Sequence, residues 1–203
     1  GLPVTFASSD TNILTISGNV ATIIGVGDVT ITASQAGNTN YNAASDVSQT
    51  ITVSKANQVI TFNALVNRTT ADTSFTLGGF ASSSLPLSYA SSNTAVATVD
   101  TNGNVTIVGA GSTTISASQS GDVNYNPATN VEQSLTVNKA DQDLTAITAF
   151  ENKVFGDVPY SASSTASSGL TVAYSSSNPA VATVASNGLV TIVGVGTTTI
   201  TAS

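Results

Sequence analysis

Apolar and polar side chains alternate with a period of two along many short stretches of this chain. In the run Thr113–Ala117, Ile115 and Ala117 share one face while Thr114 and Ser116 share the other. This is the pattern of a half-buried β-strand. The stretches between such runs are rich in Gly, Asn, Ser and Asp, which favour turns. The pattern therefore predicts an all-β fold.

One block of strands and turns occurs three times. The sequence of Ser91–Ser118 returns almost letter for letter in Ser175–Ser203, and a looser copy lies at Ser8–Ser34. Such self-similarity indicates a tandem array whose unit is a single domain. The alignment predicts the C-terminal part of repeat one at 1–56, a complete repeat two at 57–140 and the N-terminal part of repeat three at 141–203. Because Gly1 aligns with Ser84, we expect the sequence to be a piece of a longer protein.

Repeat two is about 84 residues long, a common size for a β-sandwich, and it contains seven candidate strands. A loop that holds Arg68 and Asp72 separates the first two strands, and a tight turn at Asn102-Gly103, both with positive φ, separates the fourth and fifth. We expect the sandwiches to stack end to end. The candidate strands are Gln58–Phe62, Ser74–Leu77, Leu85–Tyr89, Ala97–Val99, Val105–Val108, Thr113–Ala117 and Gln133–Lys139.

The composition narrows the functional classes. The chain has no Cys and no His, and only 7% of its residues are charged. With a net charge of −7 and four basic residues, it has no basic stripe for nucleic acid or for an anionic membrane surface. No apolar run approaches the ~20 residues of a membrane span. The acids are sparse and mostly unrepeated, which argues against paired-carboxylate catalysis. We therefore expect no enzyme activity, catalytic residue, cofactor or direct membrane insertion.

The loop Asp122–Asn126 carries oxygen side chains at alternate positions, as calcium loops do. Its copy at Asn38–Asn42 has no carboxylate, so Asx turns are the favoured interpretation and no metal site is predicted. Tyr41 and Tyr125 occupy equivalent places in the two loops. A packing role is favoured for them, and stacking on sugar rings is the alternative.

The predicted functional residues lie at the joints between repeats. The joints Lys55-Ala56-Asn57-Gln58 and Lys139-Ala140-Asp141-Gln142 lack Gly, Pro and Ser, so they differ from flexible linkers. Strand direction places the end of repeat one beside the Asp122–Asn126 loop of repeat two. We expect that loop to pack on the preceding joint, with Tyr125 as apolar cover and Lys55 near Asp122. The predicted junction residues are Lys55, Asn57, Asp122, Asn124, Tyr125, Lys139 and Asp141.

The motif SSNTAVATV, the Asn-Gly turn, VTIVGAGSTTISAS and the NYN loop resemble the group 2 bacterial immunoglobulin-like domains. That family recurs in tandem in intimin- and invasin-type adhesins. The endings TVSKA and TVNKA are similar to those in giant surface proteins of gliding bacteria. The resemblance implies a seven-stranded sandwich in an extracellular, cell-surface stalk or filament. Its partners would be neighbouring repeats, with surface glycans or other surface proteins as further candidates. The alternative is a carbohydrate-binding or spacer module of a secreted polysaccharide-degrading enzyme.

Overall fold

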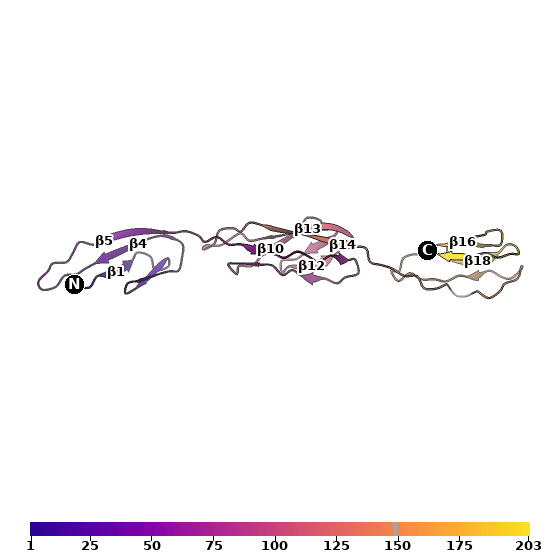
Figure 1. Ribbon diagram of the computed structural model, residues 1–203, viewed down its shortest axis with the longest axis horizontal. Coiled ribbons are helices and arrows are strands. Elements are labelled where there is room, and N and C mark those ends of the chain that lie inside the picture. Colours follow the sequence, from indigo (N-terminus) through magenta and orange to yellow (C-terminus); the bar gives the residue numbers. More distant parts are fainter. Residues whose placement is uncertain (148–149) are drawn as a thin grey trace. The chain divides into compact units, whose positions relative to one another are not determined.

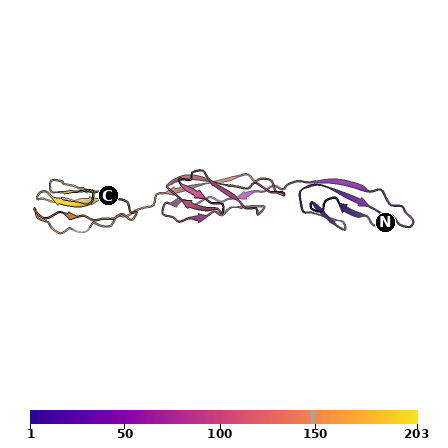
Figure 2. The same ribbon diagram turned by 180° about the vertical axis from the view of Figure 1, so that it is seen from behind.

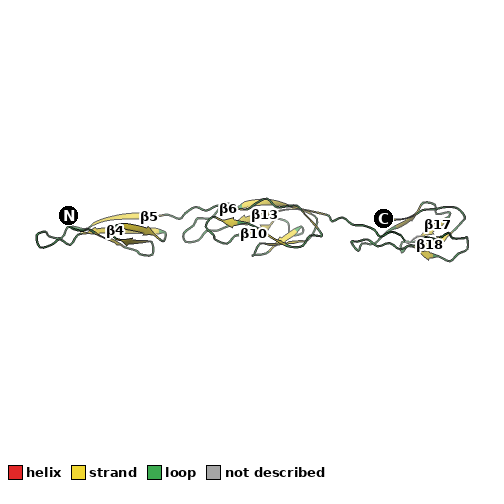
Figure 3. Ribbon diagram, turned by 60° about the horizontal axis from the view of Figure 1, so that its bottom comes forward, coloured by secondary structure: helices red, strands yellow, loops and turns green. Residues whose placement is uncertain are grey.

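The computed structural model describes residues 1–147 and 150–203. Every regular element among these residues is a β-strand (Figure 3), so the all-β prediction is confirmed. The chain divides into two compact units, Gly1–Lys139 and Ala140–Ser203, which are described separately below. Residues 148 and 149, inside predicted repeat three, lie outside the described residues. The finer division at residues 56 and 140 stays a prediction.

Repeat two is a sandwich of two sheets. One sheet has the strand order β10-β13-β14-β7, and the other has β11-β12-β8, with β6 and β9 paired beside them. In Figure 1, β10, β13 and β14 lie in one layer and β12 lies in the other. Counting β6 with β7, and β8 with β9, as interrupted single strands gives the seven strands of an immunoglobulin-like sandwich. The strands are β6 Ile60–Thr61, β7 Arg68–Thr69, β8 Phe75–Thr76, β9 Phe80–Ala81, β10 Ser88–Ser91, β11 Ala97–Val99, β12 Asn104–Ile107, β13 Gly111–Ser118 and β14 Val131–Asn138.

The placement of Arg68 in a loop is wrong. Arg68 and Thr69 form β7, which pairs in parallel with Val137 and Asn138 of β14. The first strand therefore begins in one sheet as β6 and crosses to the edge of the other sheet as β7. The Arg68 guanidinium lies 4.4 Å from the centre of the Phe75 ring, a cation–π contact.

The hairpin between β11 and β12 also differs from the prediction. Asp100 N–H donates to the carbonyl of Asn104 at 3.0 Å, which leaves a loop of the three residues between them. Within this loop Gly103 has a positive φ (79°), whereas Asn102 does not. This is the three-residue hairpin in which the last loop position adopts the left-handed conformation, so it needs Gly at one place rather than two.

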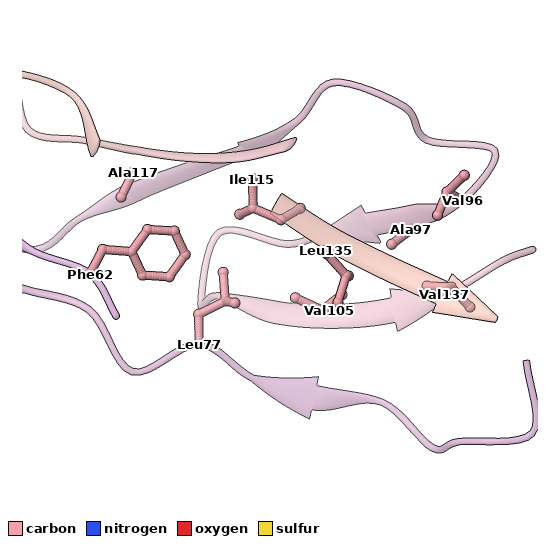
Figure 4. Packing of buried hydrophobic residues seen from close by; sticks show 9 residues of the cluster. All are labelled: Phe62, Leu77, Val96, Ala97, Val105, Ile115, Ala117, Leu135 and Val137. Carbon is pink, nitrogen blue, oxygen red and sulfur yellow. The ribbon is translucent and has the colours of Figure 1, made fainter. Parts of the chain in front are cut away.

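The core of repeat two lies between the two sheets, and Figure 4 shows its side chains converging from both layers. Ile115, Leu135 and Val105 are fully buried, and burying each such side chain contributes about 1.5–3 kcal/mol before chain entropy is subtracted. Leu85, in the candidate strand Leu85–Tyr89, is half-buried and lies outside this cluster. The buried cluster comprises Phe62, Leu77, Val96, Ala97, Val105, Ile115, Ala117, Leu135 and Val137.

Repeat one repeats this arrangement with fewer strands. Its sheets have the orders β1-β4-β5 and β2-β3. Leu14 and Val29 are buried, whereas Phe6, Ile23 and Val47 are 41%, 61% and 70% exposed. The strands are β1 Thr5–Ser8, β2 Leu14–Ser17, β3 Val20–Ile23, β4 Gly27–Ser34 and β5 Val47–Val53.

The second unit keeps the same two layers (Figure 2). Its sheets have the orders β15-β18-β17 and β16-β19, and Val190, Ala162 and Ala182 form its buried cluster. Lys153 Nζ lies 5.4 Å from the centre of the Tyr160 ring. Lys153 and Tyr160 align with Arg68 and Phe75, so both repeats place a cation over an aromatic ring. The strands are β15 Tyr160–Ser161, β16 Tyr174–Ser176, β17 Ala182–Val184, β18 Leu189–Ile192 and β19 Ile200–Ala202.

Candidate inter-repeat junction

The segment Lys55–Gln58, which connects β5 to β6 in Figure 3, pairs with the loop between β13 and β14. Ala56 and Tyr125 form a parallel bridge. Ala56 N–H donates to the carbonyl of Asn124 at 2.9 Å, and Asn126 N–H donates to the carbonyl of Ala56 at 2.9 Å. The segment thus attaches to the loop through main-chain hydrogen bonds, the chemistry by which an added strand binds.

The loop holds its shape through its own first residue. Asp122 Oδ1 accepts the N–H groups of Asn124 and Tyr125, both at 2.8 Å, and Asp122 N–H donates to the carbonyl of Tyr125 at 3.1 Å. This is the Asx turn that the sequence favours. Gly121 has φ 76°, and a Cβ there would lie 2.3 Å from the Tyr125 carbonyl oxygen, so this position needs Gly.

Lys55 reaches Asp122 as the sequence suggests, but at a different atom. Lys55 Nζ donates to the main-chain carbonyl of Asp122, while the Oδ1 atom of that carboxylate serves the turn. The adjacent side chains also meet, because Asn126 Nδ2 donates to Asn57 Oδ1 at 2.9 Å. The joint therefore uses a charge-assisted bond to the backbone.

Gln58, Gln119 and Asn126 are junction residues that the sequence prediction missed. The Gln58 side chain is 6% exposed, and its Nε2 donates to Gln119 Oε1 at 2.9 Å and to the Asn126 carbonyl at 2.7 Å. Gln58 Oε1 accepts the Ser83 hydroxyl at 2.5 Å. Gln119 Oε1 also accepts Gly121 N–H. A signal was present in the sequence, because Gln142 aligns with Gln58 and Gln35 aligns with Gln119.

The remaining predicted junction residues have different surroundings. Tyr125 is half-buried, as apolar cover requires, whereas Tyr41 in the equivalent loop of repeat one is 70% exposed. Lys139 and Asp141 are exposed and flank the boundary between the two units.

Ionisable side chains are few among the described residues, since only 7% of the residues in the sequence are charged. No group of three or more His, Cys, Asp or Glu among them is placed to hold a metal ion. None of their elements is a helix that could span a membrane. Asp100 has a carboxyl whose pKa is altered by its surroundings. Hydrogen bonds from the side-chain amide and the backbone N–H of Asn104 lower its pKa below the ordinary value, and this belongs to the β11–β12 turn.

A profile of the intimin immunoglobulin-like domain matches residues 78–121 and 157–203. The first match falls in repeat two and the second in repeat three. These two segments match the intimin-type bacterial immunoglobulin-like domain, in agreement with the resemblance seen in the sequence. The first match ends at Gly121, so it includes the first residues of the loop between β13 and β14.

Solved structures similar to these immunoglobulin-like repeats include domains 1–6 of the surface-layer protein SbsC, with 18% identity over 100% of this chain and a TM-score of 0.35. The chain spans 33% of that structure. Drosophila N-cadherin EC1–4 matches with 13% identity over 95% of this chain and 58% of its own, at a TM-score of 0.30. A C-terminal 282-residue intimin fragment, solved with the intimin-binding domain of the translocated intimin receptor, matches with 17% identity. It covers 70% of this chain and 52% of the fragment, at a TM-score of 0.28. No curated protein sequence matches the chain.

Proposed function

We propose that this chain is a structural segment of an extracellular, bacterial cell-surface protein. Its repeats act as spacers that are joined through contacts between each linker and the following β13–β14-type loop. The observation that carries the proposal is the bonded path from repeat one into repeat two. Ala56 joins the loop through two main-chain bonds, and Gln58 is buried against Gln119. A flexible linker would remain solvated and would order no side chain at such a place.

The match to the intimin immunoglobulin-like domain supports the surface location. Stiff stacking into a stalk or filament, as in a surface adhesin or a gliding bacterium's surface protein, is the finer part of the proposal. The partners are then neighbouring repeats, with a binding function carried elsewhere in the assembly.

The test is the mobility of repeat one against repeat two. Residual dipolar couplings of the full chain should show the two repeats tumbling as one body. Tyr125→Ala should loosen their relative orientation and leave the melting of each repeat almost unchanged, because it removes cover from the joint and touches neither core. Tyr41→Ala, at the exposed equivalent, is the matched control. Independent tumbling of the two repeats in the unmodified chain would overturn the proposal.

One observation favours a second candidate, a carbohydrate-binding module. Tyr41 is 70% exposed beside Asn38 and Asn42, which suits stacking on a sugar ring with amide groups at its rim. A glycan array on the full chain tests this function. Selective binding that disappears with Tyr41→Ala would establish it in place of a purely structural role.

A further inference from the structure

The β4–β5 loop of repeat one has the same internal hydrogen bonds as the β13–β14 loop of repeat two, which is occupied by the segment Lys55–Gln58. Asn38 Oδ1 accepts the N–H groups of Asn40 and Tyr41 at 2.8 and 3.0 Å, and Asn38 N–H donates to the carbonyl of Tyr41 at 2.9 Å. Gly37 N–H donates to Gln35 Oε1 at 2.8 Å, as Gly121 N–H does to Gln119. The loop therefore holds its binding conformation without a segment lying on it.

What differs is the occupancy of the loop. Within the described residues, no bond is formed by the carbonyl of Asn40 or the N–H of Asn42, the counterparts of the two groups that bind Ala56. Tyr41 is 70% exposed, whereas Tyr125 is half-buried. A hollow of about 330 Å³ lies against this loop, bordered by Pro3, Gln35 and Gly37 among others. In repeat two the counterpart of Gln35 is Gln119, which accepts a hydrogen bond from the buried Gln58. Gln119 also donates to the Pro86 carbonyl and accepts Gly121 N–H.

We propose that the loop Gln35–Ala44 is an acceptor site for an extended peptide of sequence Lys-Ala-Asx-Gln, the linker of another repeat of this kind. The Ala residue pairs with the carbonyl of Asn40 and the N–H of Asn42. The Gln side chain enters the hollow and donates to Gln35, as Gln58 donates to Gln119. The chain itself contains this sequence twice, at Lys55–Gln58 and, with Asp in third place, at Lys139–Gln142.

The Lys recognition explains why the two loops can begin with different residues. In repeat two the ammonium binds the main-chain carbonyl of Asp122 rather than the carboxylate. Asn38 presents the same carbonyl and makes the same Asx turn. The site therefore selects the linker through its backbone and the Gln side chain, and the proposal extends the proposed spacer function to a binding surface on repeat one.

Amide NMR of the full ¹⁵N-labelled chain tests the site. A peptide with the sequence of residues 53–61, added at millimolar concentration, should shift the Asn42 amide saturably and slow its hydrogen exchange, and should leave the Asn126 amide unchanged. Peptide variants serve as controls, so no folding defect can intervene. The Ala56→Pro peptide lacks the N–H that pairs with Asn40 and the Gln58→Ala peptide lacks the buried amide. Each should bind about fivefold more weakly, the effect of one hydrogen bond.

The outcomes separate this proposal from the spacer function on which it rests. No shift at Asn42, or an equal shift with a scrambled peptide, would overturn the acceptor site. Binding of an oligosaccharide at Asn42 without binding of the peptide would also overturn it, in favour of a glycan site. The spacer function is tested by the free chain, in which the Asn126 amide should exchange far more slowly than that of Asn42. Equal exchange rates of these two amides would show that Lys55–Gln58 does not bind the β13–β14 loop in the free chain. Both proposals would then be wrong.

Discussion

Repeats one and two share a sequence pattern but differ in how much of it is buried. Ile107 in repeat two is half-buried, and its counterpart Ile23 is 61% exposed. In repeat two, β12 pairs with β8 through Val105 and Phe75. In repeat one, β3 pairs only with β2 among the described strands. An apolar position therefore marks a face that suits a core, while its burial depends on the strands that cover that face.

The largest expected effect concerns the two cores. Ile115→Asp should unfold repeat two at a cost of more than about 4 kcal/mol, because it places an unpaired charge in a fully buried position. The matched change Ile31→Asp falls on a half-buried side chain and should cost clearly less. Denaturant unfolding followed by residue-specific hydrogen exchange measures both, and repeats one and three should keep their protection in the first variant. Equal losses of stability in the two variants would show that Ile31 and Ile115 are buried to the same degree.

The strands of both repeats were predictable because alternation and turn residues agree with the fold. For β13, the predicted run Thr113–Ala117 lies within the observed Gly111–Ser118. Arg68 lacks such a signal, because the stretch around it has no alternation and its strand exists only through pairing with β14. The split of the first strand between two sheets is a tertiary event, which local pattern does not encode.

The second prediction compares two equivalent glutamines. Gln58→Ala should destabilise the joint by about 1–3 kcal/mol, because the buried Gln119 amide then loses a partner. Gln142→Ala changes an exposed side chain and should cost less than about 0.5 kcal/mol. Hydrogen exchange of the Ala56 and Asn126 amides measures the stability of the joint directly, because both amides donate hydrogen bonds across it. If Gln142→Ala reduced stability as much as Gln58→Ala, burial would not be what distinguishes these two positions.

The joint could be located from the sequence, but its contacts could not. Chain direction in a sandwich places Lys55 beside the Asp122 loop, and the two residues do meet there. A pair of opposite charges suggests an ion pair, whereas the carboxylate is already engaged by two N–H groups and the ammonium takes the carbonyl. Gln58 was not predicted because an uncharged side chain suggests no interaction by its chemistry. Its recurrence at Gln142 was the available signal, and its burial in the structure shows its role.

The third prediction concerns the two Asx turns. Asp122→Ala and Asn38→Ala should each destabilise their loop by about 1 kcal/mol, since each removes the oxygen that accepts two N–H groups. Asp122→Asn should be nearly neutral, because Asn38 already fills this place in repeat one. The loop amides of each repeat, followed by hydrogen exchange, give the measurement. A large loss in Asp122→Asn would mean that the carboxylate charge has a role which the shared geometry does not explain.

The smallest expected effect is a difference in pH dependence between the hairpins β11–β12 and β2–β3. Asp100 closes the β11–β12 turn by accepting Asn102 and Asn104 N–H at 2.9 and 2.8 Å. Hydrogen bonds from the Asn104 side chain and backbone lower its folded-state pKa. A carboxyl with a lowered folded pKa stabilises the hairpin above its unfolded pKa of about 3.9, and this stabilisation is lost as the pH falls through the folded value.

The equivalent position in repeat one is Ser17, which pairs with Val20 across the two-residue turn Gly18-Asn19 and has no titrating group. Protection of the Asn104 amide, measured by hydrogen exchange and corrected for the intrinsic rate, should therefore fall below pH 4 while that of Val20 stays level. Asp100→Ala should remove the pH dependence in repeat two and leave repeat one unchanged. Because Asp100 is exposed, the change should stay local to this turn and leave the buried Ile115 amide protected. Parallel loss at Asn104 and Val20 would instead assign the acid response to the chain as a whole.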